Sequence, residues 1–167
     1  LTFSIGIFTN LTIDNLDYHK TIQNYFNSKL ILFKKLLKKK SYAIYDDNLK
    51  ISSNLNRIAK SNKINKFTMG TTKSNFLKTN HKFLKDEQKI TFKFDNKEYY
   101  FSTKLIGRVQ IKNLLMAIMA AMKSKISLEK IIKILPKIKS VNGRLEKVEN
   151  IYNNGIVILD YAHTTDA

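Results

Sequence analysis

The 167-residue sequence carries 30 Lys and Arg against 13 Asp and Glu, a formal net charge of +17 at pH 7. It has no cysteine, which excludes disulfide frameworks and cysteine-ligated zinc or iron–sulfur sites and fits a reducing cytoplasm. The longest apolar run, residues 114–122, is far shorter than the roughly 20 residues that span a bilayer, so we expect no membrane insertion. With 43% hydrophobic residues, the chain can bury a core.

The positive charge allows two interpretations. Arginine occurs only at Arg57, Arg108 and Arg144, and lysine is spread over nearly every segment. A nucleic-acid-binding surface usually gathers its charge on one side and uses arginine for bidentate contacts. The composition therefore favours drift towards lysine over a specific nucleic-acid site. A basic nucleic-acid-binding module stays as an alternative, because a surface of this charge attracts polyanions at low salt.

The first forty residues predict a strand, a loop and a helix. Residues 4–9 are typical of the end of a buried strand, and residues 10–19 of a polar loop. From residue 21 to 37 the apolar side chains recur on one helical face, and we interpret the lysine run 38–40 as the solvated end of that helix. Lys29 lies within the apolar stripe, where an ammonium is costly to bury unless it is paired or neutralised.

The middle of the chain predicts strands. Residues 42–45 and 66–69 are typical of short strands, with a weak helix over 48–60 between them. Residues 89–104 alternate apolar and polar side chains around Asp95-Asn96-Lys97, which predicts an antiparallel β-hairpin with one buried face.

The last third predicts two helices and a strand. A helix over about 111–122 is apolar nearly all round, so we expect it in a core. Ser127 is a natural N-cap for the next helix, and Pro136 ends it. The apolar block 155–159 is typical of a parallel strand covered on both faces, and its carboxyl end is where ligands bind in open α/β sheets.

The organisation predicts two unequal parts. The turn at residues 141–143 is the expected boundary, dividing the chain into residues 1–141 and 142–167. Leu1 is not an initiator methionine, and the chain stops after a polar cluster, so we expect an internal piece of a longer protein.

The first candidate site combines Asp14, Asp17 and His19 on a loop with Lys29 ten residues further on. The common arrangement for such a lysine is a stem lying on the core with the ammonium reaching solvent. The sharper hypothesis is a neutral amine that reacts with carbon dioxide to give a carbamate, an anion able to hold magnesium.

Two further clusters could contact a nucleotide. Gly107, Arg108, Gln110 and Asn113 open the apolar helix, where exposed N–H groups and an amide could hold a base or an anion, or could simply cap the helix. In the other cluster, Arg144 could pair with a phosphate and the Asp160 carboxylate could accept from ribose hydroxyls. The cluster of Arg144 and Asp160, the third candidate site, also contains Asn142, Gly143 and His163.

Five blocks, in order, carry a family resemblance. They are Ile7-Phe8-Thr9-Asn10-Leu11-Thr12 with Asp14 and Leu16-Asp17-Tyr18-His19; Asn24-Tyr25 with Ser28-Lys29-Leu30; Leu105-Ile106-Gly107-Arg108 with Asn113-Leu114-Leu115; Gly143-Arg144-Leu145-Glu146; and Asp160-Tyr161-Ala162-His163-Thr164. The sequence resembles the Mur ligase family, in particular the members that add the third residue of the peptidoglycan stem peptide, rather than the folylpolyglutamate or cyanophycin synthetases that share their fold. Residues from about 49 to 97 diverge.

The resemblance implies an α/β fold. Residues 1–141 would form the C-terminal part of a P-loop-type central ATP-binding domain, a mostly parallel sheet with helices and an added β-hairpin. Residues 142–167 would begin a Rossmann-like C-terminal domain. The implied enzyme is an ADP-forming ligase, expected to be a monomer, that uses ATP and Mg²⁺. It would convert the terminal carboxylate of UDP-N-acetylmuramoyl-L-Ala-D-Glu to an acyl phosphate and join it to meso-diaminopimelate or L-lysine.

The resemblance also implies roles for individual residues. Lys29 would be the carbamylated catalytic lysine that places magnesium, Asn113 would contact adenine, and Arg144 and Asp160 would bind the nucleotide. Asn15 stands where the family usually has a magnesium-binding histidine, so an inactive Mur-like protein is a second alternative. No G-x-x-G-K-T phosphate loop occurs in these residues, and we expect the 167-residue chain alone to be inactive.

Overall fold

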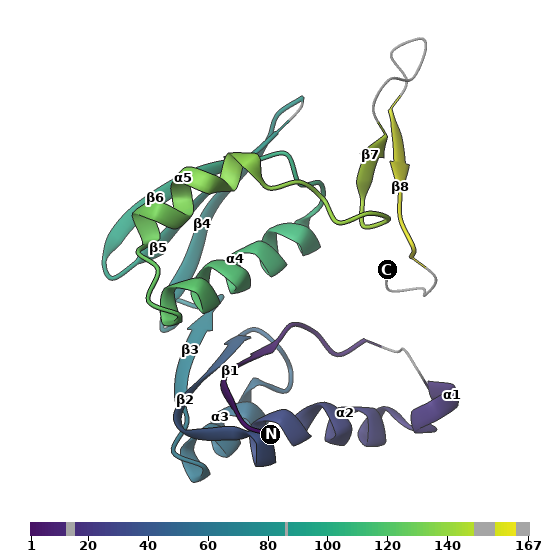
Figure 1. Cartoon of the computed structure of the whole chain (residues 1–167), viewed down its shortest axis with the longest axis vertical. Helices are drawn as coiled ribbons and strands as arrows, with labels where there is room; N and C mark the ends of the chain where they lie inside the picture. The colour runs from purple at the N-terminus through teal and green to yellow at the C-terminus, as the bar shows by residue number, and fades with distance from the viewer. Residues whose placement is uncertain (13–15, 86, 149–155, 163–167) are drawn as a thin grey trace.

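The computed structural model describes residues 1–12, 16–85, 87–148 and 156–162 (Figure 1). The strands are β1 Phe3–Phe8, β2 Leu37–Asp46, β3 Asn65–Met69, β4 Phe76–Phe83, β5 Gln88–Phe94, β6 Lys97–Thr103, β7 Glu146–Val148 and β8 Val157–Leu159. The helices are α1 Leu16–His19, α2 Ile22–Ile31, α3 Ser52–Ser61, α4 Arg108–Lys123 and α5 Leu128–Ile134, with a π-helical turn η1 Leu32–Leu36 and a 3-10 turn η2 Leu135–Lys137.

The main sheet is mixed, with the strand order β1-β2-β3-β4-β5-β6. Strands β1 to β4 pair in parallel, while β4, β5 and β6 pair antiparallel. The predicted hairpin is confirmed as β5 and β6, and its two turn residues, Asp95 and Asn96, have φ values of 50° and 58°. Two consecutive residues at positive φ are what tight hairpin turns require, and Asp and Asn tolerate them best after glycine. The expected α/β architecture with an added hairpin is therefore confirmed.

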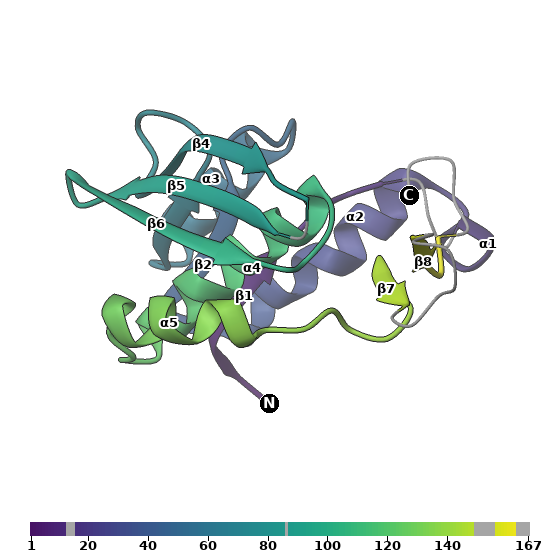
Figure 2. The ribbon, with the colours of Figure 1, turned by 90° about the horizontal axis from the view of Figure 1, so that it is seen from above.

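The main sheet separates two cores, as Figures 1 and 2 show by the helices on its two sides. Successive side chains of a strand point to opposite faces. In β2, accordingly, Ile44 belongs to the core under α4 and α5, whereas Ala43 and Tyr45 belong to the core under α2 and α3. All three are almost completely buried. β2 thus anchors both layers, and its carboxyl end is held rigidly.

The α2 helix begins where the sequence predicts but ends earlier. The Thr21 hydroxyl caps it, accepting from the Asn24 backbone N–H at 3.1 Å. The interpretation of residues 38–40 as the end of this helix is wrong, because they form the exposed beginning of β2. Lys40 has a φ of 65°, and its N–H donates to the Lys63 carbonyl at 2.8 Å. Leu36 and Leu37 continue the helical spacing, so periodicity alone does not show the change of structure.

The second half of the chain follows most of its predictions. The α4 helix buries Leu115 and Met119 in the larger core. The α5 helix begins after Ser127 and is followed by η2, which contains Pro136. The expectation of a buried parallel strand near residues 155–159 is wrong for the described part. β8 pairs antiparallel with the three-residue β7, and its side chains are exposed. Among the described residues, no helix is long and apolar enough to cross a membrane.

Candidate functional site

Lys29 of α2 reaches the carboxyl end of β1. Its Nζ donates to the backbone carbonyl of Asn10 at 3.0 Å, in the segment that leaves the strand. The same nitrogen lies 4.6 Å from the ring centroid of Tyr25 and 5.7 Å from that of Phe8. Carbonyl oxygens and aromatic faces both attract an ammonium. The half-buried Lys29 side chain is thus directed inward at the strand end, where ligands bind in α/β sheets.

A small aromatic cluster surrounds this lysine. The His19 ring packs against Tyr18 and Tyr25, with centroids 4.9 and 5.0 Å away, and its Nδ1 lies 3.5 Å from the Ser28 hydroxyl. His19 and Lys29 therefore both contact Tyr25. Asp14 and Asn15 lie outside the described residues. Within the described part of the chain, no three His, Asp or Glu side chains come together as a metal-binding group.

The second and third candidate clusters meet. The Gln110 side chain in the first turn of α4 donates from Nε2 to the Arg144 carbonyl at 3.0 Å. A Cβ added at Gly107 would lie 2.7 Å from the Leu145 side chain, so the glycine permits this close approach. Asn113 is exposed one turn further along α4. The structure thus brings Arg144 to the start of the helix that carries Asn113.

Asp160 lies near Gly143 and Arg144 because the next residue, Tyr161, contacts Gly143. The Tyr161 N–H donates to the Gly143 carbonyl at 2.9 Å, and a Cβ at Gly143 would lie 2.3 Å from the Tyr161 ring. Gly143 has a φ of 66°, a conformation that glycine adopts without strain. Its N–H donates to the Glu146 carboxylate at 2.8 Å. Asp160 itself is exposed, and His163 lies outside the described residues.

These contacts leave two separate groups of predicted site residues. Lys29 lies at the end of β1, whereas Asn113, Arg144 and Asp160 belong to the α4 region. Among the described residues, no hydrogen bond or ion pair joins Lys29 to the other three. Their assigned roles stay predictions.

The Gln110 hydrogen bond is expected to restrain the segment around Arg144. In a Gln110→Ala variant of the 167-residue chain, amide exchange at Arg144 and Tyr161 is expected to quicken by roughly 3- to 10-fold, the effect of one lost hydrogen bond. Hydrogen exchange followed by NMR measures this. Gln23→Ala, which removes an exposed amide on α2, is the matched control and should leave both rates unchanged. Equal rates in Gln110→Ala and wild type would contradict the restraint.

Sequence reasoning missed an ion pair at the end of β2. Asp46 Oδ2 lies 2.8 Å from Lys112 Nζ of α4, and Asp46 Oδ1 accepts from the Asn48 N–H at 2.8 Å. The next residue, Asp47, accepts from the Ser74 hydroxyl at 2.7 Å. Two consecutive acids directly after a buried strand were the available signal, because carboxyl ends of parallel strands share one sheet edge.

Two side chains that pack against the cores, Tyr45 and Lys123, have shifted pKa values. Burial, followed by the charge of Asp47, raises the pKa of the Tyr45 hydroxyl, which donates to the Asn56 amide oxygen at 3.0 Å. Burial lowers the pKa of Lys123, whose Nζ lies 3.8 Å from the Phe67 ring centroid. Burial is the main cause of both shifts, and neither group contacts the predicted site residues.

Comparison with known proteins identifies the family. Residues 1–121 match the Mur ligase middle domain. The chain is 35% identical over its whole length to the UDP-N-acetylmuramoyl-L-alanyl-D-glutamate–2,6-diaminopimelate ligase of Rickettsia bellii, covering 34% of that protein. It is 40% identical over 98% of its length to the ligase of the same name from Clostridium botulinum, covering 33%. The chain therefore spans about one third of the length of these curated relatives.

Solved structures share the fold. MurF from Acinetobacter baumannii superimposes with a TM-score of 0.81 at 16% identity, over 94% of this chain and 33% of that one. A UDP-N-acetylmuramoyl-L-alanyl-D-glutamate–2,6-diaminopimelate ligase gives 0.79 at 22% identity, over 98% and 33%. A mutant FPGS from L. casei gives 0.78 at 17% identity, over 99% and 40%. The fold expected from the sequence is confirmed, and the chain belongs to the Mur ligase family.

Proposed function

We propose that this chain is part of an ATP-dependent ligase that adds a diamino acid to UDP-N-acetylmuramoyl-L-Ala-D-Glu in peptidoglycan biosynthesis. Family membership supports a ligase, and the names of the relatives support this acceptor and favour 2,6-diaminopimelate over L-lysine as the third residue. The proposed enzyme is cytoplasmic and monomeric. Residues 1–141 form the end of its central domain and residues 142–167 begin its C-terminal domain. The 167-residue chain alone is expected to be inactive.

The placement of Lys29 carries this proposal. Its amine donates to the Asn10 carbonyl at the end of β1, and its side chain is half-buried. When neutral, that amine can attack the carbon of carbon dioxide and lose a proton, which leaves an anionic carbamate. The Asn10 carbonyl at this strand end is an oxygen atom that could bind a metal ion, and magnesium prefers oxygen ligands. Carbamylated Lys29 would thus hold Mg²⁺. Magnesium, when bound, neutralises charge on the transferred phosphate.

The α4 region would bind the nucleotide. In the proposed arrangement Asn113 contacts adenine, Arg144 pairs with phosphate, and Asp160 accepts from the ribose hydroxyls. Solved proteins with this fold include a Thermotoga maritima MurF in complex with ADP and an FPGS–AMPPCP complex. The reaction brings an anionic carboxylate to an anionic phosphate, so cationic groups must stabilise the charge as it moves. The acyl phosphate formed is then attacked by the amine of the incoming amino acid, and phosphate leaves.

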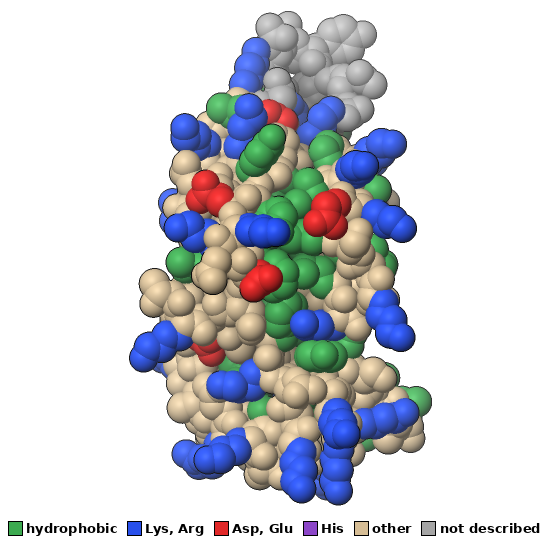
Figure 3. All heavy atoms as spheres, turned by 90° about the vertical axis from the view of Figure 1, so that its left-hand side faces the viewer, with side chains coloured by type: hydrophobic (Ala, Val, Ile, Leu, Met, Phe, Trp, Pro, Cys, Tyr) green, Lys and Arg blue, Asp and Glu red, His purple; other side chains and the backbone are tan. Residues whose placement is uncertain are grey.

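On one face of the molecule, the distribution of charge does not favour the nucleic-acid alternative. On the face shown in Figure 3, Lys and Arg side chains are spread from top to bottom, with acidic side chains and an apolar strip between them. A nucleic-acid-binding surface is expected to present a continuous basic patch.

The test uses the full-length protein that contains this chain. ADP release is expected only when ATP, Mg²⁺, UDP-N-acetylmuramoyl-L-Ala-D-Glu and a diamino acid are all present, and it should be faster with meso-diaminopimelate than with L-lysine. A folded full-length protein that releases no ADP under these conditions would favour an inactive Mur-like protein. Tight retention of random DNA on filters at about 0.2 M salt would favour the nucleic-acid-binding alternative.

A further inference from the structure

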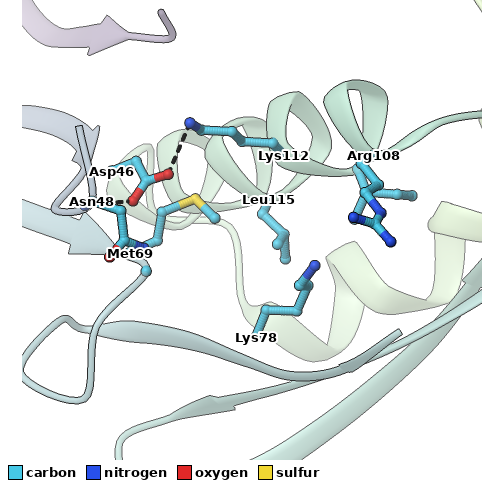
Figure 4. Close-up of a pocket in the computed structure, with 9 residues that line it drawn as sticks. Asp46, Asn48, Met69, Lys78, Arg108, Lys112 and Leu115 are labelled. Carbon is cyan, nitrogen blue, oxygen red and sulfur yellow. Dashed lines mark hydrogen bonds and ion pairs between the residues drawn. The ribbon is translucent and has the colours of Figure 1, made fainter. Parts of the chain in front are cut away.

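A pocket of about 260 Å³ lies between the carboxyl ends of β2 and β3, the strand β4 and the first turns of α4 (Figure 4). Asp46 and Lys112 form one wall, and Lys78 and Arg108 enter from β4 and from the start of α4. Lys29, Asn113, Arg144 and Asp160 are not among its lining residues. The pocket is therefore distinct from the groups to which the proposed function assigns roles.

Charge is unbalanced in this pocket. Both oxygens of Asp46 are engaged, one by Lys112 and the other by the Asn48 N–H, so this pair is internally neutral. Lys78 and Arg108 remain. Within the described residues, neither has a carboxylate within 4.0 Å, and Figure 4 shows both side chains directed to the space beside Leu115. Both cations are exposed where they line the cavity, and an anion bound there would have two opposite charges beside it.

The shape of the cations indicates the kind of anion. A guanidinium presents a planar fork that matches phosphate oxygens, and an ammonium adds a mobile point charge. The floor is apolar, formed by Ile111 and Leu115 of α4, and the volume lies slightly below the usual range for small-molecule sites, so only a small ligand fits. Such an apolar floor can pack against an organic group.

We propose that this pocket binds the phosphate group of a small phosphate monoester, held between Lys78 and Arg108, with its organic part on Ile111 and Leu115. The proposal does not depend on ligase activity. The chain lacks a G-x-x-G-K-T phosphate loop, so binding measured on the 167 residues does not come from such a loop.

The test is calorimetric titration of the 167-residue chain with phenyl phosphate and, separately, with inorganic phosphate at 0.15 M salt. One saturable site is expected, tighter for phenyl phosphate because its ring adds apolar contact. Lys78→Gln and Arg108→Gln should each weaken binding by about 10-fold or more, the loss of one charge-assisted hydrogen bond. Lys133→Gln removes the same charge from the exposed side of α5 and should change affinity by less than about 2-fold.

Each alternative outcome overturns the proposal. Equal weakening in all three variants would show that the +17 net charge attracts anions without a built site. Unsaturable binding would also exclude a site, and equal affinity for both probes would exclude the monoester. Unchanged circular dichroism and urea midpoints confirm that the variants, all at exposed positions, remain folded.

Discussion

Replacing Lys29 by alanine is expected to lower turnover of the full-length protein by about 100-fold or more, the usual effect of removing a preorganised electrostatic group from an active site. The reason is the position of its amine, which lies 3.0 Å from the Asn10 carbonyl at the end of β1. Alanine cannot form a carbamate, and the anionic group proposed to hold magnesium would be lost. Steady-state ADP release under saturating ATP measures the change.

Chemical rescue separates this role from a structural one. Short carboxylic acids such as acetate are expected to restore part of the Lys29→Ala turnover, because a carboxylate resembles the carbamate in charge and shape. Lys35→Ala is the matched control: this lysine is exposed on η1 just after α2, and its loss should leave turnover within about 2-fold of wild type. Undiminished turnover in Lys29→Ala would show that no carbamate is needed, and a loss without rescue would favour packing against Tyr25 and Phe8.

The placement of Lys29 could be predicted because the information is local. A lysine within the apolar stripe of a helix must lie along the core, and the preceding strand and loop leave few positions for the helix. The hairpin was predictable for the same reason, since alternation and the turn residues Asp95 and Asn96 lie within one short segment. Both predictions depend on residues that are close in sequence.

Contacts between distant segments were not predictable in this way. Asp46 and Lys112 are separated by 66 positions and meet only because α4 packs across the end of β2. Strand β4 was missed because its centre, Lys78 to Lys82, is polar and mostly exposed, so no alternation of apolar and polar residues reveals it. The backbone of β4 is held in a strand by its antiparallel pairing with β5, which its own sequence does not indicate. The polar side of β4 is also where Lys78 enters the phosphate pocket proposed above.

Phe92→Ala is expected to lower the free energy of unfolding of the 167-residue chain by about 3–5 kcal/mol, the range for truncating a buried phenylalanine. Phe92 is 0% exposed in the centre of β5. Its ring stacks on Phe76 of β4 at 5.2 Å and on Tyr99 of β6 at 5.6 Å, so it joins all three antiparallel strands. Alanine would leave a cavity among rigid rings, and the cavity cannot close without moving β5, which is paired on both sides. Urea denaturation followed by circular dichroism measures the loss.

The control for this variant lies on the adjacent strand. Tyr100 of β6 is 79% exposed, so Tyr100→Ala should change stability by no more than about 0.5 kcal/mol. A similar loss in both variants would mean that the hairpin is stabilised by strand propensity rather than by its buried face. A loss below about 1 kcal/mol in Phe92→Ala would mean that the antiparallel strands do not unfold together with the rest of the core. A large loss is expected only for Phe92→Ala, because Phe92 packs in the same core as α4. The hairpin and the helix of the proposed nucleotide site are therefore expected to unfold together.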